Sequence, residues 1–480
     1  MAQQLFAEAL ILVTFGAAAG LLIDVFLRDR LSYVHWPSAY NLPFEFHFQT
    51  DRGLFLYAAA AVIAAILLSS LLPSLSGSNA DLGLAMKQGE PAFSIRRWDL
   101  RNSFVTLQVV MSVVLLVLGA LFGRAFVQLA GADPGFDISH TVMTTVWLPS
   151  GAHLARDQRL VWRDSLVRRL KDTPGVVGVT SIGTLPFMGE LQQQPVRRKS
   201  DPAGTGRNAY AMGAGEQFCH VLGIPILRGR DFEITDRTRV PVPALVNRAL
   251  ARRLFGDADP IGVQVVAGQG QEHVLEIVGL VGDTRMRTLG EEHAPMFFTP
   301  YDDAQLMVRT AGHAGRWVTP IQGVLSRTEP PSAQDVRPLS DAAAGAIFPM
   351  RVAAGFIGSM SVVGLLLALS GFYSSVSYST KRRTREMAIR IAVGATQSAI
   401  QWTAIRDGVA ILACGILAGI ALATAAIRLL TNLLPDGLEP WNPAMFAGVG
   451  LILLATGVAA AWVAVRGVSK VDPAIVLKGD

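Results

Sequence analysis

Long apolar runs stand near both ends of this chain, and a long segment of mixed character separates them. A membrane-spanning helix needs roughly 20 consecutive, mostly apolar residues. About six runs meet that requirement, and the first has full spanning length with no basic region before it, which favours a retained span over a cleaved signal peptide. The predicted spans are Leu5–Phe26, Leu54–Leu72, Phe104–Phe126, Val352–Ser374, Val409–Leu430 and Pro443–Val465. The pattern predicts a polytopic α-helical membrane protein.

Residues 128–350, between the third and fourth spans, alternate short β-branched runs with amphipathic helical stretches, which predicts one α+β domain. Pro241 and Pro243 favour an edge position for the strand that holds them, because proline cannot donate to a neighbouring strand. The polar stretch Gln192–Arg207 is expected to be an exposed loop, and Gly268 to Gly270 a hairpin turn. The expected strands are Gly175–Ser181, Val240–Val246 and Val274–Val281, and the expected helices are Gln158–Lys171 and Asn247–Phe255.

The last part of the chain repeats the first. Glu8, Gly16 and Gly20 match Asp407, Gly415 and Gly419 at one constant offset, and a second set of matches follows one span later. This pattern predicts a duplicated protein in which residues 1–75 remain from a first unit. Glycines four residues apart let helices approach closely, so we expect both GxxxG pairs to lie in helix contacts. The pairs are Gly16 with Gly20 and Gly415 with Gly419.

Half of the residues are hydrophobic (51%), and the net charge is +5. Lysine and arginine collect after the second and fourth spans and in the tail. The two spans that flank residues 128–350 contain few charges. Because cytoplasmic loops are rich in these cations, both termini are expected in the cytoplasm and residues 128–350 outside it. Topology accounts for the net charge, so no nucleic-acid partner is expected.

No pattern for catalysis or metal binding emerges. Asp231 and Asp236 lie in turn-like sequence, and the histidines are scattered without a metal-ligand spacing. Cys219 and Cys414 fall in different predicted regions and are not expected to pair. We therefore predict no enzyme and no catalytic, cofactor-binding or metal-binding residue. Gln108 and Ser112, one turn apart on the third span, are candidates for an interhelical hydrogen bond.

The stretch Lys381–Thr396 (KRRTREMAIRIAVGAT) is the most distinctive in the chain. It follows the fourth span as a basic amphipathic segment, and Glu386 is placed to pair with Arg382 or Arg390 one turn away. Such a segment is typical of binding either to anionic lipid headgroups or to a cytoplasmic partner. Both partners remain open on the pattern alone.

Thr384–Thr396 resembles the signature of FtsX-like and MacB-like ABC transporter permeases. The similarity runs from about residue 100 to the end. The other motifs that resemble this family are Asp133–Phe136, Thr173–Val176, Leu222–Pro225, Arg228–Phe232, Asp259–Gly262, Val278–Asp283 and Val471–Pro473.

The resemblance implies the following organisation. Residues 1–75 hold two transmembrane helices of a first unit, 76–102 a basic cytoplasmic linker and 103–127 a transmembrane helix. Residues 128–350 form a MacB-like extracytoplasmic core domain, 351–470 an FtsX-like permease domain with three transmembrane helices, and 471–480 a cytoplasmic tail. The expected location is the bacterial cytoplasmic (inner) membrane.

The resemblance also implies a permease subunit for export or efflux that transmits the work of an ATPase through the membrane. None of the six lysines follows a glycine, as a nucleotide-binding P-loop requires, so ATP is expected to bind a partner ABC ATPase. The residues implied to contact that ATPase are Arg385, Glu386 and Arg390, with Gly394 turning the chain into the fifth span. A homodimer or a second permease, membrane lipids and an extracytoplasmic protein are further expected partners.

Two alternatives remain open. The chain would also suit an FtsX-type signalling scaffold that controls an extracytoplasmic partner and transports nothing. The resemblance further implies a complete relative with eight spans and two outer domains, so the chain would be shortened, split or read from a late start. A non-functional fragment is therefore the second alternative.

Overall fold

A computed structural model of the chain forms two compact units, Met1–Arg97 and Trp98–Asp480. It describes residues 10–11, 13–22, 53, 56–57, 59–60, 62–63, 100–147, 156–202, 204–268, 272–301, 305–327, 333–382, 396–431, 434 and 438–468. Within the first unit, Val13–Leu22 is an apolar helix inside the first predicted span. Most of the first two predicted spans lies outside the described residues.

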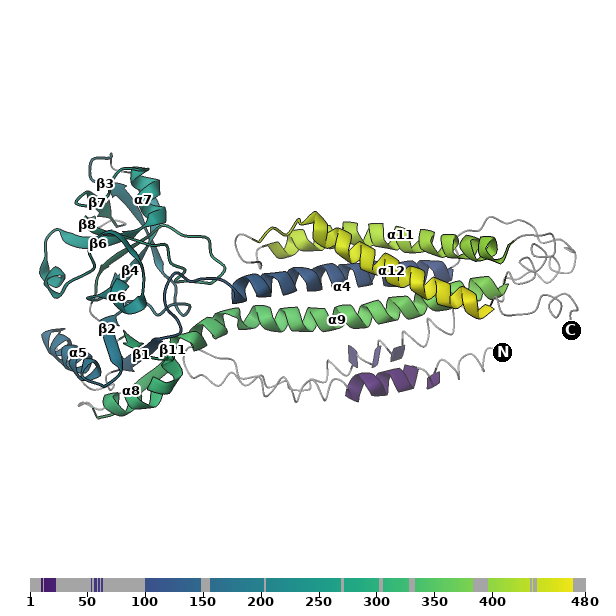
Figure 1. Ribbon diagram of the computed structural model, residues 1–480, viewed down its shortest axis with the longest axis horizontal. Coiled ribbons are helices and arrows are strands. Elements are labelled where there is room, and N and C mark those ends of the chain that lie inside the picture. The colour runs from purple at the N-terminus through teal and green to yellow at the C-terminus, as the bar shows by residue number, and fades with distance from the viewer. Residues whose placement is uncertain are drawn as a thin grey trace, which may run out of the picture. The chain divides into compact units, whose positions relative to one another are not determined.

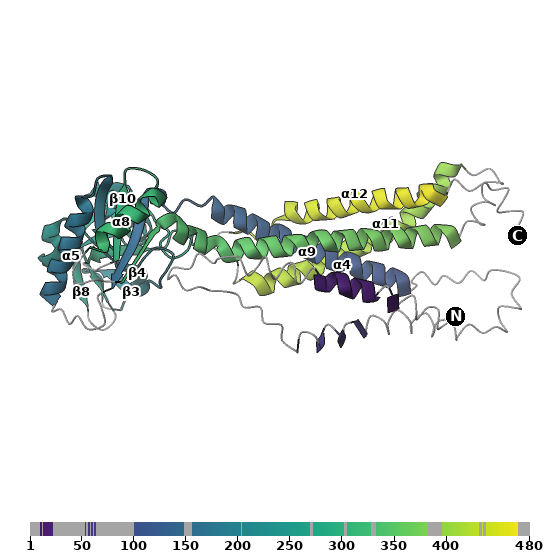
Figure 2. The ribbon, with the colours of Figure 1, turned by 90° about the horizontal axis from the view of Figure 1, so that it is seen from below.

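Four long helices of the second unit are apolar and long enough to cross a membrane. They pack alongside one another around a shared core that includes Val113, Phe372 and Leu412 (Figures 1 and 2). A helix suits this setting because it satisfies its own backbone polar groups where no water is present. The helices are α4 (Leu100–Ala130), α9 (Leu339–Arg382), α11 (Gln397–Leu430) and α12 (Pro443–Val468). The last four predicted spans are thus confirmed as helices.

Helix α9 differs from its prediction in length. The expected span Val352–Ser374 is only the middle of a 44-residue helix that begins at Leu339. Leu339 and Ala342 are buried in the core of the α+β domain between α4 and α9, which we call the outer domain. The hydropathy pattern marked only the apolar part, whereas the helix continues on both sides of it.

One sheet of the outer domain has four antiparallel strands in the order β11-β1-β10-β2. Helices α5 (Arg156–Lys171) and α8 (Val318–Leu325) cover one face through Trp162, Leu166 and Ile321. The short helix α6 (Phe218–Leu222) packs with the other face. The strands are β1 (Thr141–Trp147), β2 (Val176–Ser181), β10 (Gln305–Thr310) and β11 (Ala333–Pro338).

The second sheet has seven strands in the order β5-β8-β6-β9-β4-β3-β7, and a further pairing of β8 with β7 closes it on itself. Its interior is filled by Val246, Ile277 and Phe297 together with Leu250 of helix α7 (Arg248–Phe255). The strands are β3 (Gln192–Arg198), β4 (Arg207–Ala214), β5 (Ile226–Gly229), β6 (Val242–Asn247), β7 (Gln264–Ala267), β8 (His273–Val281) and β9 (Met296–Pro300). The expected α+β domain is confirmed.

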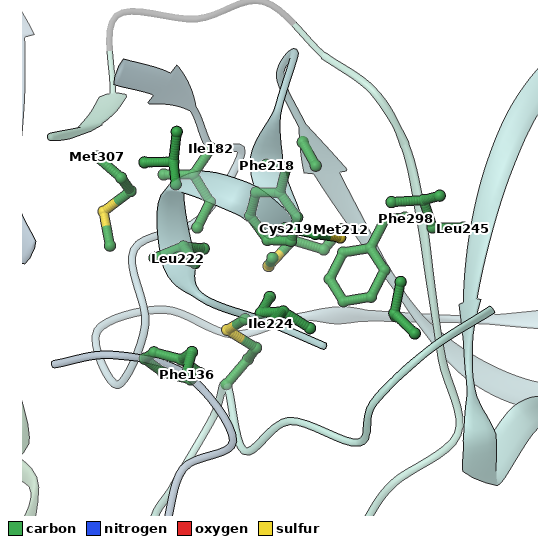
Figure 3. Packing of buried hydrophobic residues seen from close by; sticks show 14 of the residues in the cluster. Phe136, Ile182, Met212, Phe218, Cys219, Leu222, Ile224, Leu245, Phe298 and Met307 are labelled. Carbon is green, nitrogen blue, oxygen red and sulfur yellow. The ribbon is translucent and has the colours of Figure 1, made fainter. Parts of the chain in front are cut away.

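A hydrophobic cluster joins the two sheets (Figure 3). Met307 of the four-stranded sheet faces Phe298 and Leu245 of the closed sheet across α6, which contributes Phe218 and Leu222. Burial of such side chains stabilises a fold by about 1.5–3 kcal/mol each. This shared core makes the outer domain one folded body without a disulfide, since Cys219 and Cys414 are free.

Two local predictions were wrong. Strand β6 lies between β8 and β9 instead of at an edge. Pro243 is tolerated there because the pairing with β9 begins only at Leu245, so no donor is lost at the proline. The stretch Gln192–Arg207 forms β3 and the start of β4, because both edges of β3 find partners and Val196 points inward.

The other local predictions agree with the structure. Strands β2 and β8 and helices α5 and α7 lie where the pattern placed them. Asn247 caps α7 by accepting a hydrogen bond from Leu250 N at 3.0 Å. Strands β7 and β8 pair antiparallel up to Ala267 and His273, as a hairpin requires, although residues 269–271 of the predicted turn lie outside the described residues.

Candidate functional site

Helices α4 and α9 contact each other through small residues. A Cβ atom built on Gly119 would lie 2.6 Å from Ser361 Oγ, so a larger residue there would require Ser361 to shift. Ser361 Oγ is also 2.6 Å from the Leu115 carbonyl oxygen, to which it donates across the interface. Backbones approach closely at such contacts, so the packing of this pair is specific.

The predicted hydrogen bond from Gln108 and Ser112 is replaced by this one. Ser112 Oγ is buried and has no hydrogen-bond partner among the described residues. The Gln108 side chain lies against Gly371, which has no side chain to exclude it. The sequence indicated the correct face of α4 but not the donor, because the donor belongs to a helix about 250 residues away.

Helix α11 contacts α4 through one of the predicted GxxxG pairs. A Cβ atom on Gly415 would lie 2.8 Å from Val109 Cγ1, and one on Gly419 would lie 2.6 Å from Val113 Cβ. Val109 and Val113 are themselves buried in the core of the bundle. In the first unit, a Cβ atom on Gly16 or Gly20 meets no described atom within 4 Å.

The residues expected to contact an ATPase lie in the connection between α9 and α11. Helix α9 ends at Arg382, and α11 begins at Gln397. Arg385, Glu386, Arg390 and Gly394 are therefore outside the described residues. The structure describes the helices α9 and α11 on either side of this connection.

The link between α4 and β1 is attached to the closed sheet. Arg285, which follows β8, donates from its backbone N to the Pro134 carbonyl oxygen at 2.9 Å. Its Nη1 donates to the Asp133 carbonyl oxygen at 3.2 Å. Gly135 has a φ of 81°, and a side chain there would collide with the Asp283 carbonyl oxygen. The end of α4 is thus joined through this link to the segment after β8.

Charged groups hold the same link against the four-stranded sheet. Asp137 accepts hydrogen bonds from the backbone N atoms of Ser139 and His140, at 3.0 and 3.1 Å, and its Oδ2 lies 3.5 Å from Arg309 Nη2. Burial by itself raises the pKa of Asp137, but the hydrogen bonds from His140 and Ser139 outweigh it, and the net pKa is lowered. The carboxylate therefore stays ionised as an acceptor at neutral pH.

Helix α9 is connected to the outer domain through β11, which lies beside β1, the strand that follows α4. It continues directly from β11, which pairs antiparallel with β1 from Val142 opposite Pro338 to Trp147 opposite Ala333. Two packed membrane helices thus lead into two hydrogen-bonded strands (Figure 1). The joint formed by these helices, the two strands and residues 131–137 is the candidate functional site. No local sequence pattern predicts this joint, since the strands that pair in it are far apart in the chain.

The titratable residues singled out in the sequence have structural partners. Asp236 is buried and accepts from Arg230 Nη1 and Nη2 at 2.6 and 2.8 Å. Asp231 Oδ2 accepts from His220 N at 3.1 Å, and burial raises the pKa of Asp231. Burial also raises the pKa of the Cys219 thiol above its ordinary value, which disfavours a reactive thiolate. No group of three metal-binding side chains gathers within the described part of the chain.

Two protein families match the chain in adjacent segments. The family described as MacB-like periplasmic core domain matches residues 104–335, from within α4 to within β11. The family described as FtsX-like permease C-terminal matches residues 358–473, which contain most of α9 and all of α11 and α12. Together the two segments span well over half of the chain.

Curated relatives have similar sequences over part of their length. The macrolide export ATP-binding/permease protein MacB of Neisseria meningitidis is 21% identical over 277 residues, which cover 54% of this chain and 41% of the relative. The pyoverdine export ATP-binding/permease protein PvdT of Pseudomonas syringae is 24% identical over 323 residues, which cover 63% of this chain and 49% of the relative. The chain thus spans less than half of the length of either relative.

Solved structures with some likeness include the periplasmic region of MacB from Actinobacillus actinomycetemcomitans, with a TM-score of 0.30 and 13% identity. That likeness covers 43% of this chain and 91% of the solved one. The extracellular domain of the transporter YknZ from Gram-positive bacteria has a TM-score of 0.28 and 16% identity, and covers 41% of this chain and 99% of the solved one. Scores this low support no conclusion about this chain. On the two family matches and the helices that they contain, the chain belongs to the FtsX-like permeases that carry a MacB-like periplasmic core domain.

Proposed function

We propose that this chain is the permease subunit of an ABC-type exporter. In this proposal, a separate ATPase binds the cytoplasmic side of the bundle, and its ATP-driven motion moves the extracytoplasmic domain against a cargo. The membrane is the bacterial cytoplasmic membrane, with both termini in the cytoplasm. Relatives whose names describe export of a macrolide and of pyoverdine support the export class.

The observation that carries the proposal is the joint described above. Helix α9 is 44 residues long, which corresponds to about 66 Å at 1.5 Å per residue. A bilayer with its headgroups is about 40–45 Å thick, so this helix is long enough to cross it and still reach β11. One continuous helix of that length would link the two sides of the membrane without an intervening loop.

The proposal also assigns the segment after α9. The cationic residues Arg385 and Arg390, with Glu386 between them, would contact the ATPase, and Gly394 would permit the turn into α11. In this proposal a second copy of this chain or another permease completes the complex.

Affinity purification of the tagged chain from its native membranes in mild detergent tests the proposal. We expect a chain with a P-loop to copurify in a stoichiometric amount, and its ATPase activity to change when the permease is removed. Absence of any ATPase would contradict the proposal. A stable extracytoplasmic protein partner together with unchanged distribution of exported compounds would instead favour a signalling scaffold.

A further inference from the structure

A cavity of about 430 Å³ lies at the base of the outer domain, beside the end of α4. Its walls come from the last turn of α4, from the link to β1 and from the segment after β8. The side chains important here are Gln128, Asp133, Asp283, Arg285, Leu289 and His293. This cavity is distinct from the cytoplasmic segment assigned to the ATPase. Its wall includes part of the joint, but the proposed function gives the cavity itself no ligand.

The depth of the cavity places it at the outer headgroup layer. The candidate span on α4 has 29 residues, about 43 Å in length, whereas the hydrocarbon layer is about 30 Å thick. Arg124 is exposed on α4, and Arg428 on α11 stacks over Trp441 at 5.8 Å, an arrangement typical of a membrane interface. Gln128 lies one turn, or about 6 Å, beyond Arg124. Lipid headgroups therefore reach the cavity wall.

The cavity combines two carboxylates with one guanidinium group. One Asp133 oxygen accepts from Gly135 N at 2.9 Å, and one Asp283 oxygen accepts from Ala249 N at 2.8 Å. Each carboxylate keeps a second oxygen that can accept from a ligand. Arg285 supplies the positive charge beside them. The set is complementary to a molecule that carries both a cationic hydrogen-bond donor and an anion.

Unpartnered polar atoms point to a polar occupant. Arg285 Nε and Thr284 Oγ1 are buried and have no hydrogen-bond partner among the described residues. Arg285 lines the cavity, whereas Thr284 precedes it in the same segment and is not a lining residue. Buried polar groups in native proteins are almost always paired with protein, ordered water or ligand. The guanidinium of Arg285 donates from Nη1 to Asp133 and keeps further N–H donors for an acceptor on a ligand, which an apolar tail alone would not supply.

We propose that this cavity binds the headgroup of a zwitterionic phospholipid of the outer leaflet, one that carries a primary ammonium and a phosphate. The ammonium donates to the free oxygens of Asp133 and Asp283, and the phosphate faces Arg285 and His293. A primary ammonium has three N–H donors, whereas a trimethylated ammonium has none. The site thus prefers phosphatidylethanolamine to phosphatidylcholine, and its two carboxylates disfavour phosphatidylglycerol.

Native mass spectrometry of the purified full chain tests this site without an ATPase, so its outcome is separate from that of the proposed function. After delipidation, the chain is mixed with equal amounts of the three lipids. We expect about tenfold more retained phosphatidylethanolamine than either other lipid, the difference that one or two charge-assisted hydrogen bonds provide. The double variant Asp133→Asn and Asp283→Asn should lose this preference.

Two controls separate binding from folding. Asp172→Asn with Asp257→Asn removes the same charge from exposed positions elsewhere and should keep the preference. Ala132→Phe fills the cavity from the link that follows α4, keeps every charge and should lose the preference. Thermal unfolding midpoints close to the parent's identify folded variants. Equal retention of the three lipids by the parent, or an unchanged preference in both cavity variants, would overturn the proposal.

Discussion

At the scale of single residues, Asp236 shows how the outer domain is stabilised without a disulfide. Its buried carboxylate caps a short 3-10 helix (Ile234–Thr238) through Glu233 N at 2.9 Å and accepts two hydrogen bonds from Arg230. The side-chain hydrogen bond from Arg230 lowers the pKa of Asp236 below 3.8. A lowered carboxyl pKa stabilises the fold above the unfolded-state pKa, and this contribution is lost as the pH falls through the folded-state pKa.

Replacing Asp236 with asparagine should therefore lower the free energy of unfolding at pH 7 by about 2 kcal/mol, because hydrogen bonds to an ionised group are lost. The loss relative to the parent should begin to shrink below about pH 3.8, where the unfolded parent binds a proton, and should disappear below the lowered folded-state pKa. Urea unfolding followed by circular dichroism at both pH values measures this. A pH-independent difference would show that the charge of Asp236 has no role.

The glycines of the bundle make a second prediction at this scale. Gly419→Leu should destabilise the bundle by about 1–3 kcal/mol, because the side chain would overlap Val113 in a packed core. Gly448→Leu on α12 is the matched control, since no described atom lies within 4 Å of its Cβ position. Thermal unfolding in detergent compares the two. Equal midpoints would contradict a close-packed role for the Gly415 and Gly419 face.

At the scale of elements, α9 contains a point where it can bend. Pro349 lies inside the helix, where it removes the hydrogen bond to the carbonyl of Gly345 and lowers the local helix stability by roughly 3 kcal/mol. Gly345 adds to this weakness, because glycine is a poor helix former. The two residues lie between Ala343, which packs with the outer domain, and Arg351, which directly precedes the predicted span. Bending at this point would tilt the outer domain on the bundle.

The double variant Gly345→Ala and Pro349→Ala should stiffen α9. Spin labels at the exposed positions Val240 and Val363, in a Cys414→Ser background, report the distance between outer domain and bundle by pulsed electron paramagnetic resonance. We expect a narrower distance distribution in the variant. Gly355→Ala, also on α9 and in open space, should leave the width unchanged. Equal widths in the parent and the double variant would exclude a hinge here.

At the scale of the whole molecule, the proposed function requires the two ends of the bundle to act on each other. The segment after α9 lies at the opposite end of that helix from β11. Alanine at both Glu386 and Arg390 should lower the permease-dependent part of the ATPase activity by at least about tenfold, the effect of losing a 1.4 kcal/mol interaction. The protein should remain in the membrane, since the spans are intact.

Arg466→Ala, a cation at the end of α12, is the matched control for that double variant and should retain coupling. ATPase activity in proteoliposomes measures the coupling, and membrane fractionation measures insertion. Full coupling in the double variant would show that the ATPase contacts a different part of the chain. Loss of insertion in the control as well as in the double variant would point to a lipid-anchoring role for these cations.

The sequence alone determined the parts of this protein that depend on local pattern. Apolar runs predicted the four spans of the second unit, because a lipid-exposed helix must be apolar along its whole crossing. Period and turn residues predicted β2, β8, α5 and α7, and the spacing of Gly415 and Gly419 predicted a helix contact. Arg385, Glu386, Arg390 and Gly394 remain predictions, since they lie outside the described residues.

Only the tertiary structure decided which distant residues meet. Pro243 suggested an edge strand, yet β6 is internal because β9 pairs with it only beyond the proline. Gly119 accommodates Ser361 across more than 200 residues of chain, and Gly135 accommodates the backbone of Asp283. The closure of the seven-stranded sheet, the joint of α4 and α9 with β1 and β11, and the cavity beside α4 all depend on such contacts. These features are stabilised by packing and hydrogen bonds between segments far apart in sequence. Local periodicity does not predict which distant segments will meet.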